Sequence, residues 1–391
     1  MKYNFDKVIL RSNTRSLKHD TQEQYVKPKD TIPMWVADMD FEAPPEVLEA
    51  IRQRAEYGIF GYSVRTDDYY DAVINWMRRR FAWEVKQSWI TFTPGVVPAL
   101  NFAIKAFTHP GDKVIIQPPV YYPFMNAVIN NGRRLVTNQL IQHENGTYAI
   151  DFDDLERSID DQTRLIIFCS PHNPVGRVWR LEELNRFAKI CLKHDLVVVS
   201  DEIHADLIMP GYKHTVLETL SDEIASRVVT CTAPNKTFNL AGLGVANIII
   251  SNASLRNSFN TELSKAGLMM TNTFGIEATI AAYRYGEPWL EALNSYLHQN
   301  FKFLAAFVRD HLPQVKAIPL EGTYLVWLDF RGMGRSDDEI NETLLNQAKV
   351  WLSDGSIFGK GGEGFQRINI ATPRDVLERG LKQIAKAFAD N

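Results

Sequence analysis

The stretch Leu196-Val197-Val198-Val199-Ser200-Asp201 is a short apolar run that ends in an acidic residue. β-Branched side chains dominate it, and no polar residue interrupts it before Ser200. Strands of a parallel sheet have this composition because helices cover both of their faces. We therefore predict a buried strand here, with Asp201 at its carboxyl end.

Runs of the same character surround this stretch, at residues 113–116, 165–169, 228–232 and 246–250. Between two of them, residues 181–194 carry apolar side chains at helical spacing, namely Leu181, Leu184, Phe187, Ala188, Cys191 and Leu192. The order strand, helix, strand predicts an α/β domain with right-handed crossovers and a mostly parallel sheet.

The two ends of the chain have a different pattern. Residues 323–330 and 365–370 alternate more, and Ser336-Asp337-Asp338-Glu339 fits a capping box that opens a helix. The first 45 residues are rich in turn formers and indicate an irregular arm. We predict an N-terminal arm over 1–45, ordered by packing against the rest of the protein, a large domain over 46–290, and a small α+β domain over 291–391.

The bulk composition excludes several classes of protein. The 391 residues carry a net charge of −4 with no basic stripe, so we expect no nucleic-acid partner. No apolar run approaches the roughly 20 residues that cross a bilayer, and the first ten residues lack a signal-peptide core. We therefore expect no membrane partner and a cytoplasmic location. The three cysteines lack metal-site spacing, and no metal is expected.

Two polar residues follow the predicted strands closely. Asp201 lies beyond a strand's carboxyl end, where open α/β sheets bind ligands, although a helix N-cap is the plainer interpretation. Lys236 follows the run at 228–232 in a segment of small and turn residues. An amine in a cleft forms an imine with a carbonyl when its pKa is lowered, whereas most lysines are simply exposed.

Two further segments suit ligand contacts. Asn173 sits in Pro171-His172-Asn173-Pro174-Val175-Gly176, where two prolines and a glycine fix a turn that can aim the amide. Thr93-Pro94-Gly95-Val96-Val97 opens a predicted helix, whose free N–H groups and dipole suit a phosphate. Each segment also has an ordinary structural explanation, as a plain turn or a common helix start.

Two other patterns carry no site. Gly359, Gly361 and Gly364 match G-x-G-x-x-G, but a predicted strand follows the glycines, and none of the required βαβ context surrounds them. Asp201, Glu202 and His204 form a lone cluster without a second ligand group, which is poor evidence for a metal.

Taken together and in this order, the segments resemble the aminotransferase-like, fold-type I enzymes that use pyridoxal 5'-phosphate (PLP), over nearly the whole chain. The likeness is greater to one branch, the C–S β-lyases with cystathionine β-lyase and cysteine desulfhydrase activities. The motifs that carry it are PMWVADMDF at 33–41, SDEIH at 200–204, APNKTFNLAG at 233–242 and GGEGFQRINIA at 361–371. The resemblance implies a large domain with a mostly parallel seven-stranded sheet flanked by helices, plus a smaller α+β domain.

The resemblance also implies roles around the cofactor ring. Lys236 would hold PLP as an imine and later move protons, and Asp201 would pair with the pyridinium nitrogen. Asn173 would bond the ring hydroxyl, with His204 near it. Tyr121 would stack on the ring face, with its neighbour Tyr122 as the alternative.

Further implied roles concern the phosphate and the substrate. The N–H groups of Gly95, Val96 and Val97 would cradle the phosphate, with Thr232 as an added donor. Tyr62 would reach it from the partner of a two-fold homodimer. The arm over 1–45 would contribute to the small domain and to the dimer contacts. Arg367 would clamp the substrate α-carboxylate with two parallel hydrogen bonds, beside Ala37 and Asn173.

The sequence departs from the usual aminotransferase pattern at two positions. Gly244 stands where an arginine, eight residues after the lysine, usually touches the phosphate, and Ala233 replaces a serine. These departures and His204 favour a lyase that eliminates a thiol from Cβ, leaving pyruvate and ammonia. An aminotransferase of the same family is the alternative, and a lyase scaffold with a second, protein-binding regulatory role is a further one.

Overall fold

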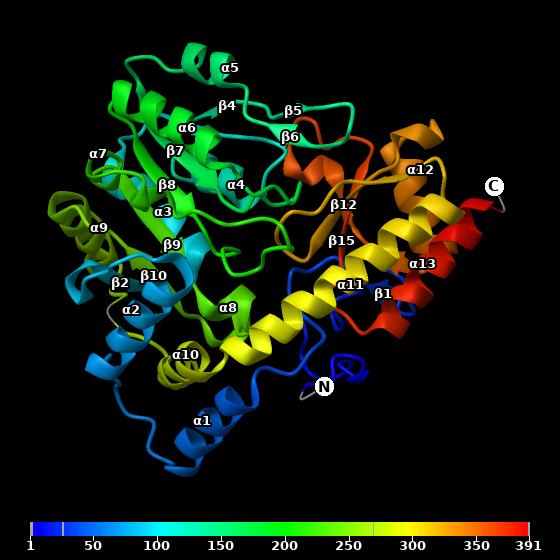
Figure 1. Ribbon diagram of the computed structural model, residues 1–391, viewed down its shortest axis with the longest axis horizontal. Helices are drawn as coiled ribbons and strands as arrows, with labels where there is room; N and C mark the ends of the chain where they lie inside the picture. The colour runs from blue at the N-terminus through cyan, green and yellow to red at the C-terminus, as the bar shows by residue number, and fades with distance from the viewer. Residues whose placement is uncertain (1–2, 26, 269, 390–391) are drawn as a thin grey trace.

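The computed structural model describes residues 3–25, 27–268 and 270–389. A large α/β part carries a seven-stranded sheet, and a smaller part with its own sheet lies beside it (Figure 1). Residues 1–2 of the predicted arm lie outside the described residues, and so do residues 390–391 of the predicted small domain. The predicted domain limits themselves stay a prediction.

The large sheet has the strand order β2-β10-β9-β8-β7-β3-β4. Its strands are β2 (Ile90–Thr93), β3 (Lys113–Ile116), β4 (Arg134–Thr137), β7 (Thr163–Cys169), β8 (Val197–Asp201), β9 (Val228–Thr232) and β10 (Ala246–Ile249). The strands from β9 to β4 pair in parallel, which confirms the predicted mostly parallel seven-stranded sheet.

The expected parallel direction is wrong for the run at 246–250, because β10 pairs antiparallel with both β9 and β2. The connection from β9 to β10 contains only α8 (Pro234–Thr237) and one turn of 3₁₀ helix at Ala241–Leu243. A parallel neighbour needs a crossover, usually a full helix. Here the chain turns back at the sheet edge instead, and this turn carries Lys236.

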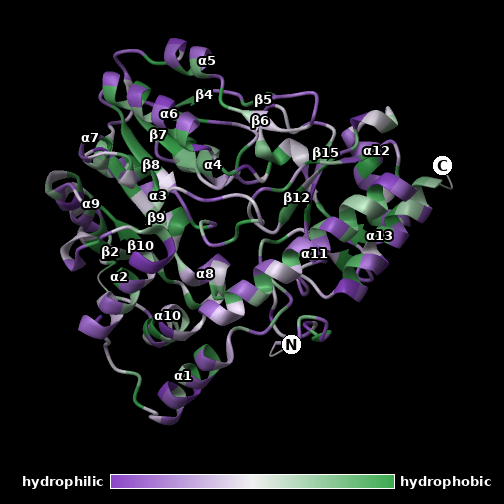
Figure 2. Cartoon of the chain, viewed as in Figure 1, coloured by the Kyte–Doolittle hydropathy of each residue, from purple (hydrophilic) through white to green (hydrophobic). Residues whose placement is uncertain are grey.

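Alternate residues of each central strand pack on opposite sides of the sheet. Leu165, Ile167 and Val199 face α3 (Val96–Phe107), α4 (Pro123–Asn130) and α9 (Ala253–Lys265). Ile166 and Val198 face the other layer, α5 (Phe152–Arg157), α6 (Leu181–Lys193) and α7 (Asp222–Ala225). Figure 2 shows the strands as the hydrophobic centre between polar-faced helices. Burial on both faces explains why the strands are nearly continuous apolar runs.

The small part is built on an antiparallel sheet of order β11-β12-β15-β14. Its strands are β11 (Lys316–Ala317), β12 (Leu325–Asp329), β14 (Ser353–Asp354) and β15 (Phe365–Asn369), and its helices are α12 (Asp337–Glu342) and α13 (Arg374–Ala389). The predicted capping box between Ser336 and Glu339 is present. Two short strands, β1 (Ile32–Pro33) and β13 (Val350–Trp351), pair in parallel and attach the N-terminal arm to this part.

Four helices complete the frame. They are α1 (Pro45–Glu56), α2 (Asp67–Phe81), α10 (Thr273–Tyr285) and α11 (Glu287–His311), and a small hairpin is formed by β5 (Ile141–Gln142) and β6 (Tyr148–Ala149). The long α11 begins beside α10 near the large sheet and extends to α13 in the small part (Figure 1). Among the described residues, no helix combines the length and the apolar character that a membrane span requires.

Candidate functional site

Three predicted site residues gather at one edge of the large sheet. Strands β7, β8 and β9 are adjacent and parallel, so the segments that leave their carboxyl ends emerge side by side. Asn173 follows β7, Asp201 ends β8, and Lys236 follows β9. In β9, Cys231 lies opposite Asp201 in the register. The strand order therefore brings a carboxylate, an amide and an amine to the ligand-binding edge of the fold.

Lys236 lies on the short helix α8, partly buried and facing the cavity. Its Nζ donates a hydrogen bond to the Ala37 carbonyl oxygen at 2.6 Å. Burial lowers the pKa of Lys236 to about 8, although the Asp38 carboxylate acts in the opposite direction. An amine with this pKa gives up its proton far more readily than a surface lysine, as a nucleophile or a general base requires.

Asp201 is a buried carboxylate without an ion-pair partner among the described residues. Its Oδ1 accepts a hydrogen bond from the Ile203 amide at 3.2 Å. Burial raises the pKa of Asp201 to about 7, while the charge of Lys236 lowers it. A buried charge needs a partner of opposite sign, and a protonated ring nitrogen would supply one.

His204 also has an unused hydrogen-bonding atom. Its ring is buried, and no described residue bonds its Nδ1. Burial lowers the pKa of His204 well below its usual value, and the nearby Lys236 and Arg367 charges act in the same direction. A neutral imidazole therefore points a free nitrogen into the interior, which fits a polar ligand group such as a ring hydroxyl.

Arg367 approaches from β15 of the small part and is held by neutral acceptors. Its Nη1 donates to Asn173 Oδ1 at 3.0 Å, and its Nη2 donates to the Trp35 carbonyl at 2.8 Å and to Ser353 Oγ at 3.2 Å. The buried Nε has no hydrogen-bond partner among the described residues, and burial lowers the pKa of Arg367 to about 10. The side chain thus lacks the anion that a guanidinium prefers, and a substrate carboxylate would provide it.

Two adjacent tyrosines line the same cavity as Lys236 and Arg367. Burial raises the pKa of the Tyr121 phenol to about 12, so this ring stays neutral. Tyr122 is the more exposed of the two, and its ring lies 5.4 Å from that of Tyr121. The greater burial of Tyr121 favours it over Tyr122 for the predicted stacking role.

The predicted phosphate turn begins α3. Gly95 is the N-cap residue, and Thr93 Oγ1 donates to its carbonyl at 2.8 Å, which holds the turn. The first amides of a helix have no partner within the helix and suit an anion. Gly244 adopts the left-handed φ of +58°, and a Cβ there would lie 3.5 Å from the Pro94 carbonyl. The residue at the expected arginine position therefore packs directly against this turn.

The structure separates other predicted residues from this group. Thr232 Oγ1 donates to the Asn247 carbonyl at 3.1 Å, so its hydroxyl hydrogen points into the sheet. Tyr62 is 92% exposed and does not line the cavity. The roles of Thr232 and Tyr62 at a phosphate stay predictions.

A cavity of about 1150 Å³ lies between the large and small parts and is lined by residues of both. Predicted residues that line it are Lys236, Arg367, Ala37, Tyr121 and its alternative Tyr122, and the amide of Asn173 is hydrogen-bonded to Arg367. Asp201, His204 and the Gly95-Val96-Val97 turn lie at the same sheet edge but do not line this space. Concave sites with a few converging polar groups are typical of small-molecule binding.

Several residues of the site were not singled out from the sequence. Tyr324 donates its hydroxyl to the Ala37 carbonyl at 2.9 Å, and Asn369 Nδ2 donates to the carbonyls of Val36 and Asp38. Both lie within segments that had been noted, the strand at 323–330 and the motif at 361–371. Arg11, which also lines the cavity, had no signal in the sequence.

Comparison with known proteins agrees with this geometry. The family described as Aminotransferase class I and II matches residues 29–384. Cystathionine beta-lyase PatB of Bacillus subtilis (strain 168) is 46% identical over 387 residues, which cover 99% of this chain and 100% of that protein. The solved structure of cystalysin from Treponema denticola, which contains PLP, is 41% identical with a TM-score of 0.96 and covers 100% of each chain. A PLP-bound C–S lyase from Staphylococcus hominis is 36% identical, with a TM-score of 0.90 and 98% of each chain covered.

Proposed function

Because the chain belongs to the aminotransferase class I and II family, we propose that it is a PLP-dependent C–S β-lyase. Its substrates would be cystathionine, cysteine or related S-substituted cysteines, cleaved to a thiol, pyruvate and ammonia. The observation that carries the proposal is the partly buried Lys236 amine with its lowered pKa, which shares one sheet edge with the unpaired Asp201 carboxylate and one cavity with Arg367. The full-length likeness to a cystathionine β-lyase supports the choice of reaction.

The residues present fit the cofactor. When bound, PLP supplies an electron sink that stabilises negative charge on the substrate Cα. Lys236 would hold it covalently, and Asp201 would keep its ring nitrogen protonated. The free Nδ1 of His204 and the amide of Asn173 would face the ring hydroxyl. The amides that begin α3 would hold the phosphate.

The chain's own groups then position the substrate and move one proton. Arg367 would bind the α-carboxylate through its fixed fork, which turns the Cα–H bond towards Lys236. Nζ of Lys236, once the substrate's amino group has replaced it on the cofactor, would be a free amine. A pKa of about 8 leaves part of it neutral near neutral pH, and this neutral form would take the Cα proton. The Ala37 carbonyl would then accept a hydrogen bond from the resulting ammonium. When Cβ carries a good leaving group, loss of that group is faster than return of the proton, and elimination results.

Purified protein with PLP is expected to release pyruvate and thiol from cystathionine. Pyruvate is measured by coupled reduction to lactate, and the thiol by a colorimetric reagent. Alanine is the matched control, because it has the same carboxylate and Cα–H but no leaving group on Cβ, and should give no thiol. If a supplied 2-oxo acid is instead converted to a new amino acid faster than pyruvate forms, the aminotransferase alternative is correct.

We further propose that the active unit is a homodimer in which Tyr62 completes the partner's site. Large apolar side chains crowd the exposed segment around Tyr62, namely Tyr57, Ile59, Phe60 and Val64. Such a patch on a soluble surface marks an interface. A two-fold axis would place each copy of this segment against its neighbour.

Hybrid dimers test this arrangement. Tyr62→Ala and Lys236→Ala homodimers should each be impaired, whereas a mixture refolded together should regain roughly a quarter of the wild-type sites, since each hybrid holds one intact site. Activity is measured as pyruvate release, and sedimentation velocity confirms that both variants remain dimers. Absence of recovery in proven hybrids would place Tyr62 outside the neighbour's site.

A further inference from the structure

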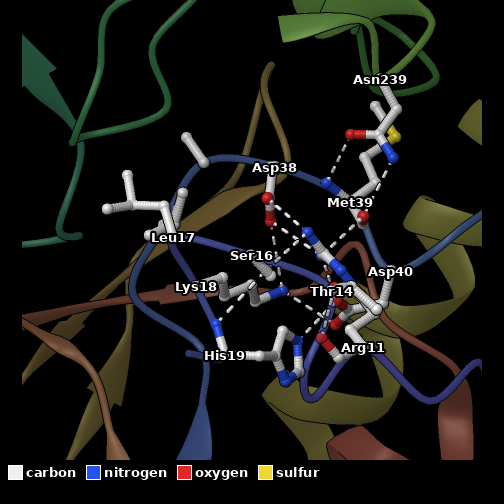
Figure 3. A network of polar contacts seen from close by, with 12 residues as sticks. Arg11, Thr14, Ser16, Leu17, Lys18, His19, Asp38, Met39, Asp40 and Asn239 are labelled. Atoms are coloured by element: carbon white, nitrogen blue, oxygen red, sulfur yellow. Dashed lines mark hydrogen bonds and ion pairs between the residues drawn. The ribbon is translucent and has the colours of Figure 1, made fainter. Parts of the chain in front are cut away.

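A partly buried charge network joins two segments of the N-terminal arm (Figure 3), and two of its members, Arg11 and Asp38, line the cavity. Arg11 donates two hydrogen bonds to Asp38, from Nη1 to Oδ1 at 3.1 Å and from Nη2 to Oδ2 at 2.7 Å. Its Nη1 also donates to Asp40 Oδ1 at 2.7 Å. Lys18, only 1% exposed, lies 2.8 Å from Asp40 and 3.7 Å from Asp38. Burial would raise the pKa of Asp40, but Lys18, His19 and Arg11 lower it far more. Each carboxylate of the network therefore has a cationic partner, including the one buried cation, Lys18.

This network holds one end of an irregular segment, residues 35–39, that borders the site. The carbonyl oxygen of every residue in it accepts a hydrogen bond from a side chain elsewhere in the chain. The donors are Arg367 and Ser353 to residue 35, Asn369 to residues 36 and 38, Lys236 and Tyr324 to residue 37, and Arg11 and Asn239 to residue 39. Side chains, rather than a neighbouring strand, satisfy these carbonyl oxygens. The position of the Ala37 oxygen therefore depends on the side-chain hydrogen bonds to the residues on either side of it.

The amine of Lys236 is surrounded by a small set of charged and titratable groups. From the arm comes Asp38, from β8 Asp201, from β15 Arg367, and the remaining neighbours are His204 and Tyr324. After burial, the largest influence on the pKa of Lys236 is the Asp38 carboxylate, which raises it, followed by Arg367, which lowers it. Asp38 is thus the charged group with the largest effect on the pKa of Lys236, and Arg11 and Lys18 are the counterions of Asp38.

Resting on the proposed function, we propose that Asp38, clamped by Arg11 and Lys18, is a positioning residue for Lys236. It fixes the Ala37 carbonyl that receives the amine and places one carboxylate charge next to it. Arg11 and Lys18 balance that charge, so the arm adjusts how readily the catalytic nitrogen carries a proton. The Lys236 nitrogen is positive when protonated, whether it is free or joined to the cofactor, so the sign of the effect is the same in both states.

Opposite pH shifts in two variants test the proposal. Asp38→Asn leaves Arg11 and Lys18 unbalanced beside the amine, and should move the pH midpoint of the bound cofactor's visible absorption change to lower pH. Arg11→Gln removes a positive charge that offsets the Asp38 carboxylate, so the same midpoint should move to higher pH. Each shift is expected to be roughly half to one pH unit, as for one charge in partly screened surroundings. The double variant should return close to the wild-type midpoint.

The acid limb of the kcat/KM profile should follow the spectroscopic midpoints in direction. Arg52→Gln, which alters an exposed ion pair on α1, is the matched control and should leave both readouts in place. Far-UV circular dichroism and cofactor content verify folding. If Arg11→Gln does not fold, Arg11→Lys keeps the charge but cannot grip both oxygens, and should lower kcat without moving the midpoint.

A purely structural role of the arm predicts shifts in one common direction or none, and either result overturns the inference. The proposed function fails separately, by absence of pyruvate release from the wild-type protein. Pyruvate release with unmoved midpoints in folded Asp38→Asn and Arg11→Gln would leave the lyase assignment standing and refute the role of Asp38 alone.

Discussion

Lys236→Ala should lose the covalently held cofactor and at least roughly a thousandfold of kcat/KM, because it removes both the nucleophile and the general base. The variant is expected to keep its fold, since the lost side chain makes one hydrogen bond, to the Ala37 carbonyl. Reduction with borohydride followed by peptide mass spectrometry should detect the cofactor on residue 236 of the wild-type protein and nowhere on the variant.

The control for this change is Lys213→Ala, which removes an exposed lysine elsewhere in the chain. It should retain the cofactor, the colour and the activity. Lys236→Arg serves as a second variant, since it keeps a positive charge whose pKa is too high for proton abstraction, and it should be as inactive as the alanine variant. A Lys236→Ala protein that still turns over cystathionine would refute the proposed function.

Asp201→Asn is expected to lower kcat by roughly a hundred- to a thousandfold, with a smaller change in KM, because the lost charge acts at the reacting centre. In the present environment burial raises the pKa of Asp201 to about 7, so the carboxylate gains its charge as pH rises through this value. A cationic ring nitrogen beside it would favour the charged form and move that titration to lower pH. The amide has no charge at any pH and cannot keep the ring nitrogen protonated.

The readouts for Asp201→Asn are the kinetic constants and the visible spectrum of the bound cofactor. Cofactor content should remain near one per chain, because Lys236 and the amides of the α3 turn are unchanged. Asp222→Asn, at the exposed start of α7, is the control and should behave as wild type. Full kcat in a folded Asp201→Asn protein would show that the carboxylate does not support the cofactor ring.

Three candidate site residues lie together as the strand pattern predicts, and the reason is geometric. Apolar runs mark parallel strands, and the carboxyl ends of parallel strands meet at one edge. A polar residue directly after such a run is therefore placed by the fold itself, which is why Asp201, Lys236 and Asn173 converge. Arg367 has no such local signal, since it lies within a strand of another sheet, and it was found through its motif alone.

The sequence alone determined the α/β class, the mostly parallel sheet, the capped helix at Ser336 and the positions of Asp201 and Lys236 at strand ends. These features depend on local periodicity, capping and strand ends, which neighbouring residues encode. Tertiary structure alone decided the antiparallel direction of β10, the charge clamp of Arg11 and Lys18, and the Ala37 carbonyl as acceptor for Lys236 and Tyr324. The two contacts to the Ala37 carbonyl join residues separated by 199 and 287 positions, and only the packing of the arm and the small part against the large sheet brings them within hydrogen-bond distance. The clamp joins residues 29 and 22 positions apart, across an irregular segment whose path no local pattern specifies.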